Sequence, residues 1–143
     1  TPLSAGSFIV IRDSHGVDWE IRVTQVLVTD SLQPSYDNSI RKAAGRFAIV
    51  FMEVTNRGLS PETFIAFGRL DIRDASGQVF ENDPVADIAA RDIYGVDGCV
   101  DINPDESTNC VAVYDISTQS NFYVLVPGAL ANPNTPNVLL NVP

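Results

Sequence analysis

The feature that most constrains this chain is a pair of cysteines, Cys99 and Cys110, which flank the turn-forming segment 103–106. If that segment joins two antiparallel strands, Cys99 lies directly opposite Cys110, at a Cα separation of about 4.5–5.5 Å. A disulfide spans this distance, so the spacing predicts a disulfide across a β-hairpin. Such bonds persist in oxidising compartments, which indicates an exported protein and leaves neither thiol free for catalysis or metal binding.

Apolar and polar residues alternate along most of the chain, as in strands with one buried face. Trp19, Ile21 and Val23 follow this period of two. The phase shifts at Gln25, which favours a β-bulge. Segment 46–54 is apolar at both odd-numbered and even-numbered positions, which is typical of a central strand covered on both faces. The further strands that the pattern predicts are 8–11, 70–73, 78–81, 110–116, 122–126 and 138–142.

A long polar connection at residues 29–45 interrupts the strand pattern. It contains Pro34, Tyr36 and the basic pair Arg41–Lys42. Loops of this length in compact domains are usually functional or disordered, so we expect the segment to carry a function or to lack fixed structure.

A short helix is predicted over residues 83–94. Asp83 is suited to cap it and Pro84 to occupy its first position, and the spacing of Val85, Ile88 and Ala89 predicts one apolar face. Together, about 7–9 short antiparallel strands and one helical insert predict an all-β, immunoglobulin-like β-sandwich. The length of 143 residues fits a single domain spanning 1–143.

Four short motifs occur in an order that resembles a known family. They are FAIVFMEVTNRG at 47–58, LDIRDASG at 70–77, PDES at 104–107 and VYDI at 113–116. The order resembles a bacterial immunoglobulin-like domain family of unknown function, found in lipoproteins and secreted proteins and similar in fold to the mycobacterial secreted immunoprotective antigen. The resemblance covers roughly residues 8–126, apart from the cysteines, the 29–45 connection and the helical insert. It implies the sandwich fold and export, and it brings no catalytic residues with it.

The net charge of −9 argues against two classes of partner. A field of this sign repels the phosphates of nucleic acids and the headgroups of anionic membranes. The chain also lacks an apolar run of about 18 residues, so we expect no membrane insertion by this segment. It begins without an initiator Met or a leader-like segment, as expected of a mature or excised fragment.

The segment 97–106 is rich in oxygen ligands of the kind that calcium prefers. The candidate ligands are Asp97, Asp101, Asn103 and Asp105. The last three repeat the first ligand positions of a calcium-binding loop, but Glu106 stands where that loop needs glycine, and Ala112 where it needs glutamate. Calcium is therefore a possible ligand, while the alternative is a solvated acidic edge whose Asp and Asn residues form turns.

Two residues, His15 and Asp115, have side chains of the kinds that enzymes use in catalysis. His15 lies in a turn beside Asp13 and Ser14, and three neighbouring turn residues cannot orient one another as a catalytic triad does. Asp115 lies in an apolar strand, where burial would raise its pKa, or where it would accept hydrogen bonds from a loop backbone. A structural role explains both residues, and we expect no enzymatic activity.

Exposed tyrosines on loops are typical of binding surfaces. The candidate partner-binding residues are Tyr36, Arg41, Lys42 and Tyr94. The sequence thus favours a noncatalytic, exported interaction or structural module of a cell-envelope or secreted protein, without a cofactor and with a protein partner. The alternative is a module that binds calcium or a small ligand through segment 97–106.

Overall fold

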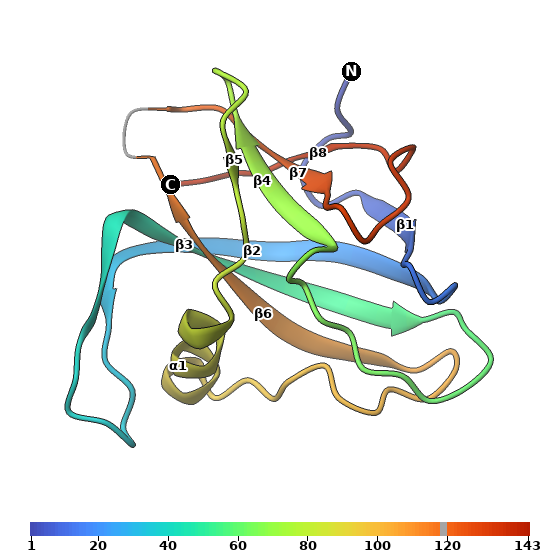
Figure 1. The fold of residues 1–143 in the computed structure, drawn as a ribbon, viewed down its shortest axis with the longest axis horizontal. Helices are drawn as coiled ribbons and strands as arrows, with labels where there is room; N and C mark the ends of the chain where they lie inside the picture. The colour runs from blue at the N-terminus through green and yellow to red at the C-terminus, as the bar shows by residue number, and fades with distance from the viewer. Residues whose placement is uncertain (118–119) are drawn as a thin grey trace.

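The protein is a β-sandwich of two antiparallel four-stranded sheets (Figure 1). The computed structural model describes residues 1–117 and 120–143, and in these ranges eight strands and one helix occur. One sheet has the order β1-β2-β3-β6, formed by Phe8–Arg12, Asp18–Leu32, Arg41–Asn56 and Ser107–Ile116. The other has the order β5-β4-β7-β8, formed by Val79–Phe80, Leu70–Asp74, Tyr123–Pro127 and Val138–Leu139. The sandwich and its single short helix are as predicted.

The main core lies between the two sheets, and a second, smaller one lies on the opposite face of β3 and β6. Successive strand residues point to opposite faces, so Val50 and Met52 enter the main core while Phe47 and Ile49 enter the second. Helix α1 (Pro84–Tyr94) covers the second core with its alanines. The prediction that 46–54 is a central strand covered on both faces is therefore confirmed.

The connection predicted at 29–45 is wrong in its bounds. Strand β2 continues to Leu32 and β3 begins at Arg41, so only residues 33–40 form the loop of a long hairpin. The polar side chains of this hairpin face water, and for that reason the sequence pattern predicted a loop over them. Leu32, by contrast, is buried in the second core. The bulge predicted at Gln25 is confirmed by a register shift between Val23 and Gln25.

Helix α1 begins and ends at the residues that the sequence indicated. The side chain of Asp83 accepts a hydrogen bond from the backbone N–H of Ala86, and Gly95 ends the helix in the left-handed region at φ 65°. The predicted apolar face is confirmed at Ala89 and wrong at Val85 and Ile88, which are exposed. No helix among the described residues is long and apolar enough to cross a membrane.

The face that packs against the sheet is made of small side chains and one carboxylate, namely Ala86, Asp87, Ala89 and Ala90. Small side chains allow the helix axis to approach the sheet closely, so the larger Val85 and Ile88 are left on the flanks. The buried face of this helix is thus the one with the smaller side chains and not the one with the larger apolar side chains.

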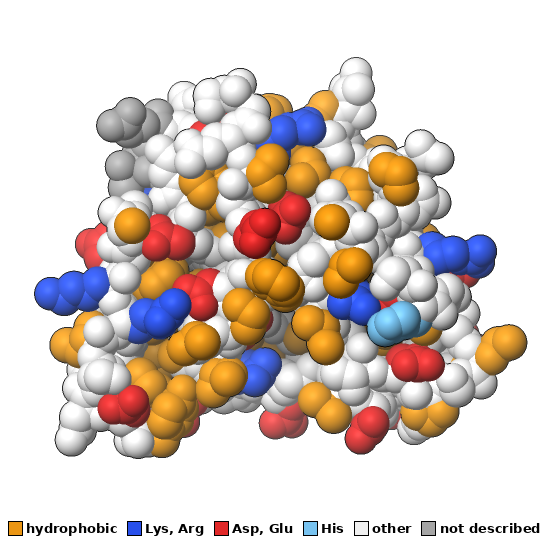
Figure 2. All heavy atoms as spheres, viewed as in Figure 1, with side chains coloured by type: hydrophobic (Ala, Val, Ile, Leu, Met, Phe, Trp, Pro, Cys, Tyr) orange, Lys and Arg blue, Asp and Glu red, His pale blue; other side chains and the backbone are white. Residues whose placement is uncertain are grey.

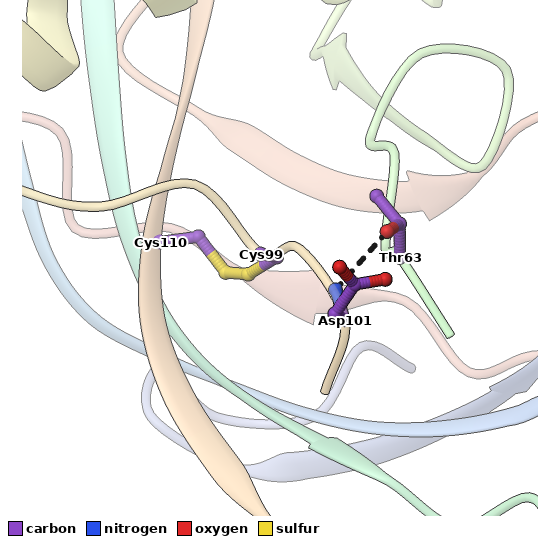
Figure 3. Close-up of a disulfide and its surroundings, with 4 residues drawn as sticks. All are labelled: Thr63, Cys99, Asp101 and Cys110. Carbon is purple, nitrogen blue, oxygen red and sulfur yellow. Dashed lines mark hydrogen bonds between the residues drawn. A yellow bond between two sulfur atoms is a disulfide. The ribbon is translucent and has the colours of Figure 1, made fainter. Parts of the chain in front are cut away.

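The disulfide joins Cys99 to Cys110 as predicted, with a Cα–Cα separation of 5.6 Å, but it does not cross a hairpin (Figure 3). Cys110 lies in β6 opposite Met52 of β3. The segment containing Cys99 pairs with residues 62–64 instead, because Ile102 exchanges two backbone hydrogen bonds with Glu62. The disulfide thus attaches an irregular segment to the sheet, and residues 103–106 turn the chain without joining two paired strands.

Candidate functional site

Two polar contacts attach the tip of the β2–β3 hairpin to helix α1. The backbone N–H and the hydroxyl of Ser35 donate to the carboxylate of Asp92, at 2.6 and 2.9 Å. The guanidinium of Arg41 donates to Asp83 at 2.7 Å. Asp83 caps the start of the helix and Asp92 lies near its end, so the hairpin is attached near both ends of the helix.

A hollow of about 200 Å³ lies between this loop and the helix. Three apolar side chains around it are exposed, namely Tyr36 at 61%, Ile40 at 51% and Val85 at 59% of their surface. The hollow is completed by Pro34, Asp37, Ser39, Arg41 and Ala89. Figure 2 shows apolar side chains gathered over the part of the molecule where α1 and the hairpin lie in Figure 1. We call the loop 33–40 with the flank of α1 that bears Val85 the hairpin–helix surface.

The structure brings together some of the residues predicted to bind a partner. Tyr36 and Arg41 line the same hollow, although the guanidinium of Arg41 is already bound to Asp83. Lys42 is exposed on β3 and does not line the hollow, and Tyr94 packs edge-on against Phe51 with ring centroids 5.5 Å apart.

The sequence reading did not anticipate Ile40 or the exposure of Val85. The exposure of Ile40 could have been predicted from the mixed apolar and polar composition of 33–40, because an isoleucine in a polar loop has no buried strand face to occupy.

The residues predicted to bind calcium do not converge in the structure. Asp97, Asp101, Asn103 and Asp105 are all exposed. The carboxylate of Asp105 pairs with Arg57 at 2.9 Å, and Asp101 donates its backbone N–H to the hydroxyl of Thr63 (Figure 3). Within residues 1–117 and 120–143, no three His, Cys, Asp or Glu side chains are grouped as a metal site requires. The arrangement gives the calcium hypothesis no support.

Asp115 and His15 have structural neighbours. The carboxylate of Asp115 accepts the backbone N–H groups of Ala44 and Gly45, at 2.7 and 2.9 Å. Gly45 approaches β6 so closely that a Cβ would collide with the carbonyl of Ile116. His15 is exposed, and its backbone N–H donates to Asp13, whose carboxylate also accepts from Trp19 in the core.

A buried polar network closes the edge of β6 that faces away from β3. The carboxylate of Asp87 accepts the backbone N–H of Val113 at 2.6 Å and the amide Nδ2 of Asn82 at 2.9 and 3.0 Å. The same Nδ2 donates to the carbonyl of Val113 at 3.1 Å. Burial raises the pKa of Asp87 from 3.8 to about 6, against the hydrogen bonds and the charge of Arg91, which favour the ionised form.

The sequence analysis singled out neither Asp87 nor Asn82. The available signal was the position of Asp87, three residues before Ala90 and one after Ala86, on the small-residue face of the helix. A carboxylate at such a position is buried once the alanines pack.

Residues 15–131 match the family described as a domain of unknown function, DUF4352. The chain belongs to the DUF4352 family. Membership agrees with the resemblance noted in the sequence and assigns no reaction or ligand to the hairpin–helix surface. No curated protein matches the chain.

Solved structures share the DUF4352 fold seen here. The yjhA protein from Bacillus subtilis has a TM-score of 0.62 at 15% identity, with 99% of each chain covered. A conserved hypothetical protein from Bacillus anthracis has a TM-score of 0.61 at 14% identity, covering 96% of this chain and 95% of that one. MPT63, a secreted protein from Mycobacterium tuberculosis, has a TM-score of 0.54 at 14% identity, covering 99% and 98%. At these identities the likeness concerns the fold.

Proposed function

We propose that this chain is a noncatalytic, exported binding module whose protein partner docks on the hairpin–helix surface. The observation that carries the proposal is the convergence of Tyr36, Ile40 and Val85, each more than half exposed, around one hollow. Exposed aromatic and aliphatic side chains around a depression are the usual anchors of protein interfaces.

The hairpin–helix surface also has the rigidity that recognition requires. The hairpin is attached to the helix through Ser35 of the loop and Arg41 of β3, and the helix is attached to the sheet through Asp87. A surface held in one conformation loses little entropy when a partner binds. The 33–40 loop therefore supports binding as part of a fixed scaffold.

Export is supported by two independent observations. Disulfides such as Cys99–Cys110 form and persist mainly in oxidising compartments, and the fold is shared with a secreted protein. We place the module outside the cytoplasm, in the cell envelope or the surrounding medium, where its negative charge keeps it soluble.

Photo-crosslinking tests the proposed surface. A photoreactive phenylalanine analogue replaces Tyr36 in one variant and Phe8, an exposed aromatic residue of β1, in a matched control. After exposure to the surface fraction and culture medium of the producing organism, we expect a discrete adduct from position 36 and none from position 8. Adding Ile40→Ser and Val85→Ser should remove the adduct. Identical adducts from both positions, or none from position 36, would contradict the proposal.

A further inference from the structure

A second cavity, of about 220 Å³, lies on the other flank of helix α1. The helix supplies Ile88 to its lining, the segment before β4 supplies Phe64 and Ile65, and the segment after the helix supplies Val100. The disulfide also lines it. The walls are thus mainly apolar, and the disulfide fixes the segment that carries Val100.

Polar groups in the lining come from the network at the edge of β6 and from the helix. Asn82 and Asp87 line the cavity together with Arg91. Asn82 is only 4% exposed, and its Oδ1 has no hydrogen-bond partner among the described residues, whereas its Nδ2 is fully engaged. A buried carbonyl oxygen without a donor is costly, so this atom favours a ligand that brings an N–H or O–H group.

The charges around Asp87 indicate which donor fits. Asp87 is 8% exposed, and its carboxylate is ionised at neutral pH because its pKa is about 6. Asp83 and Arg91 lie on the same helix, and Tyr114 faces Asp87 from β6. Asp83 is paired with Arg41, and Tyr114 is fully buried with its pKa raised well above 10, chiefly by burial, and is therefore neutral. A buried carboxylate is stabilised by a cationic donor.

We propose that this cavity binds a small primary amine with an apolar body, whose ammonium group donates hydrogen bonds to Oδ1 of Asn82 and to the carboxylate of Asp87. The apolar body then contacts Phe64, Ile88 and Val100. The binding site shares only helix α1 with the hairpin–helix surface, so it does not depend on the function proposed above.

The size of the cavity sets the size of the amine. A cavity of roughly 150 Å³ lined by apolar side chains accommodates benzene, so one of about 220 Å³ accommodates a single ring with an aminomethyl group. Benzylammonium is therefore the probe. Two comparison ligands test the role of charge. Benzyl alcohol has the same apolar body with a neutral hydrogen-bond donor, and benzoate has the same ring with a negative charge.

Two-dimensional NMR titration at pH 7.5 provides the test. We expect benzylammonium to shift the methyl signals of Ile65, Ile88 and Val100, and to bind about tenfold more tightly than benzyl alcohol, as a charge-assisted hydrogen bond implies. Benzoate should bind more weakly than either. Equal binding of the three probes, or the absence of shifts at 10 mM (roughly the weakest affinity a probe of this size would show) with benzylammonium, would overturn the proposal.

Two variants locate the site. Asp87→Asn should remove the preference for the amine over the alcohol while leaving a neutral side chain of the same shape. Because that variant also alters the edge of β6, Ile88→Trp, at an exposed position, tests the site without touching the network. Ile88→Trp should abolish binding, and Val85→Trp, at an exposed helix position that does not line this cavity, should leave it unchanged. Unchanged binding in Ile88→Trp, or loss of binding in Val85→Trp, would place the amine elsewhere.

Discussion

Beside the short backbone pairing of Asn82 with Tyr114, Asp87 closes the edge of β6 with a side chain where other sheets would use a further strand. Its carboxylate accepts the Val113 N–H that a neighbouring strand would otherwise bind. The interaction protects the edge, but it requires a carboxylate to be buried, which disfavours its ionised form. Protection of the edge and sensitivity to pH therefore come from the same residue.

We predict that the protein becomes more stable as the pH falls from 7.5 to 5. Folding raises the pKa of Asp87 from 3.8 to about 6, so the folded state binds a proton more readily than the unfolded chain. The stabilisation is fully present below pH 3.8 and is lost as the pH rises through about 6. Over this window, urea denaturation should show a gain of about 1 kcal/mol in the free energy of unfolding.

Asp87→Asn should remove this gain, and Asp97→Asn, at an exposed position, should retain it. Asp18, whose pKa is lowered by its hydrogen bond to Arg12, acts in the opposite direction, but only near and below 3.8. A gain that persists in Asp87→Asn would mean that another group titrates in this range.

At the scale of elements, the disulfide holds a segment that has little secondary structure of its own. We predict that the double variant Cys99→Ala, Cys110→Ala loses about 3 kcal/mol of unfolding free energy, because the bond closes a short loop between cysteines 11 residues apart. Guanidinium denaturation of the oxidised protein and of the variant measures the difference. A reducing agent should destabilise the wild type and leave the variant unchanged, and a variant as stable as the wild type would refute the role of the disulfide.

The hairpin is predicted to tolerate changes in its loop but not in its strands. Replacing residues 35–39 with Asn-Gly removes the exposed bonds to Asp92 and shortens the loop, so unfolding free energy should change by about 1 kcal/mol or less. Leu32→Ala removes a buried side chain from the second core and should cost about 2–5 kcal/mol. A deletion of residues 31–43 would remove Leu32 as well, so it would not separate binding from folding. Thermal and urea denaturation of the two variants provide the comparison.

Local features of the sequence predicted individual strands and the helix well, but predicted less well which segments pair with each other. The cap at Asp83, the bulge at Gln25 and the strand at 46–54 were predictable because each depends on neighbouring residues. The pairing of Ile102 with Glu62 depends on residues 40 positions apart, and alternation alone carries no information about which strands meet. Of the candidate site, Tyr36 was predictable as an exposed loop aromatic, whereas the buried Asn82–Asp87 network required the packing of the helix to be known.

At the scale of the whole molecule, the two candidate binding sites lie on the two flanks of α1. This is the side of the sandwich where the helix covers the outer face of β3 and β6. The sheets are held to each other by buried contacts, including the hydroxyl of Tyr114 donating to the carbonyl of Leu70 and the pairing of Arg69 with Asp13. A scaffold fixed in this way can carry a loop and a helix without changing its core.

The net charge of −9 acts on the whole molecule, and we predict that sodium chloride stabilises it. The 18 acidic side chains outnumber the 9 Lys and Arg side chains, and most of the ion pairs are solvent-exposed, so mutual repulsion of the carboxylates outweighs what those pairs contribute. Raising the salt concentration from about 0.02 to 0.5 M shortens the screening length to a few ångströms, and the melting temperature should rise by about 3 °C.

The matched variant is Asp30→Lys, Asp97→Lys, which alters two exposed positions and changes the net charge from −9 to −5. It should melt at a higher temperature than the wild type in low salt, and it should respond less to added salt, since less repulsion remains to be screened. A melting temperature that falls with salt in the wild type would show that attractive ion pairs, such as that of Arg57 with Glu20 and Asp105, dominate the electrostatic free energy of this fold.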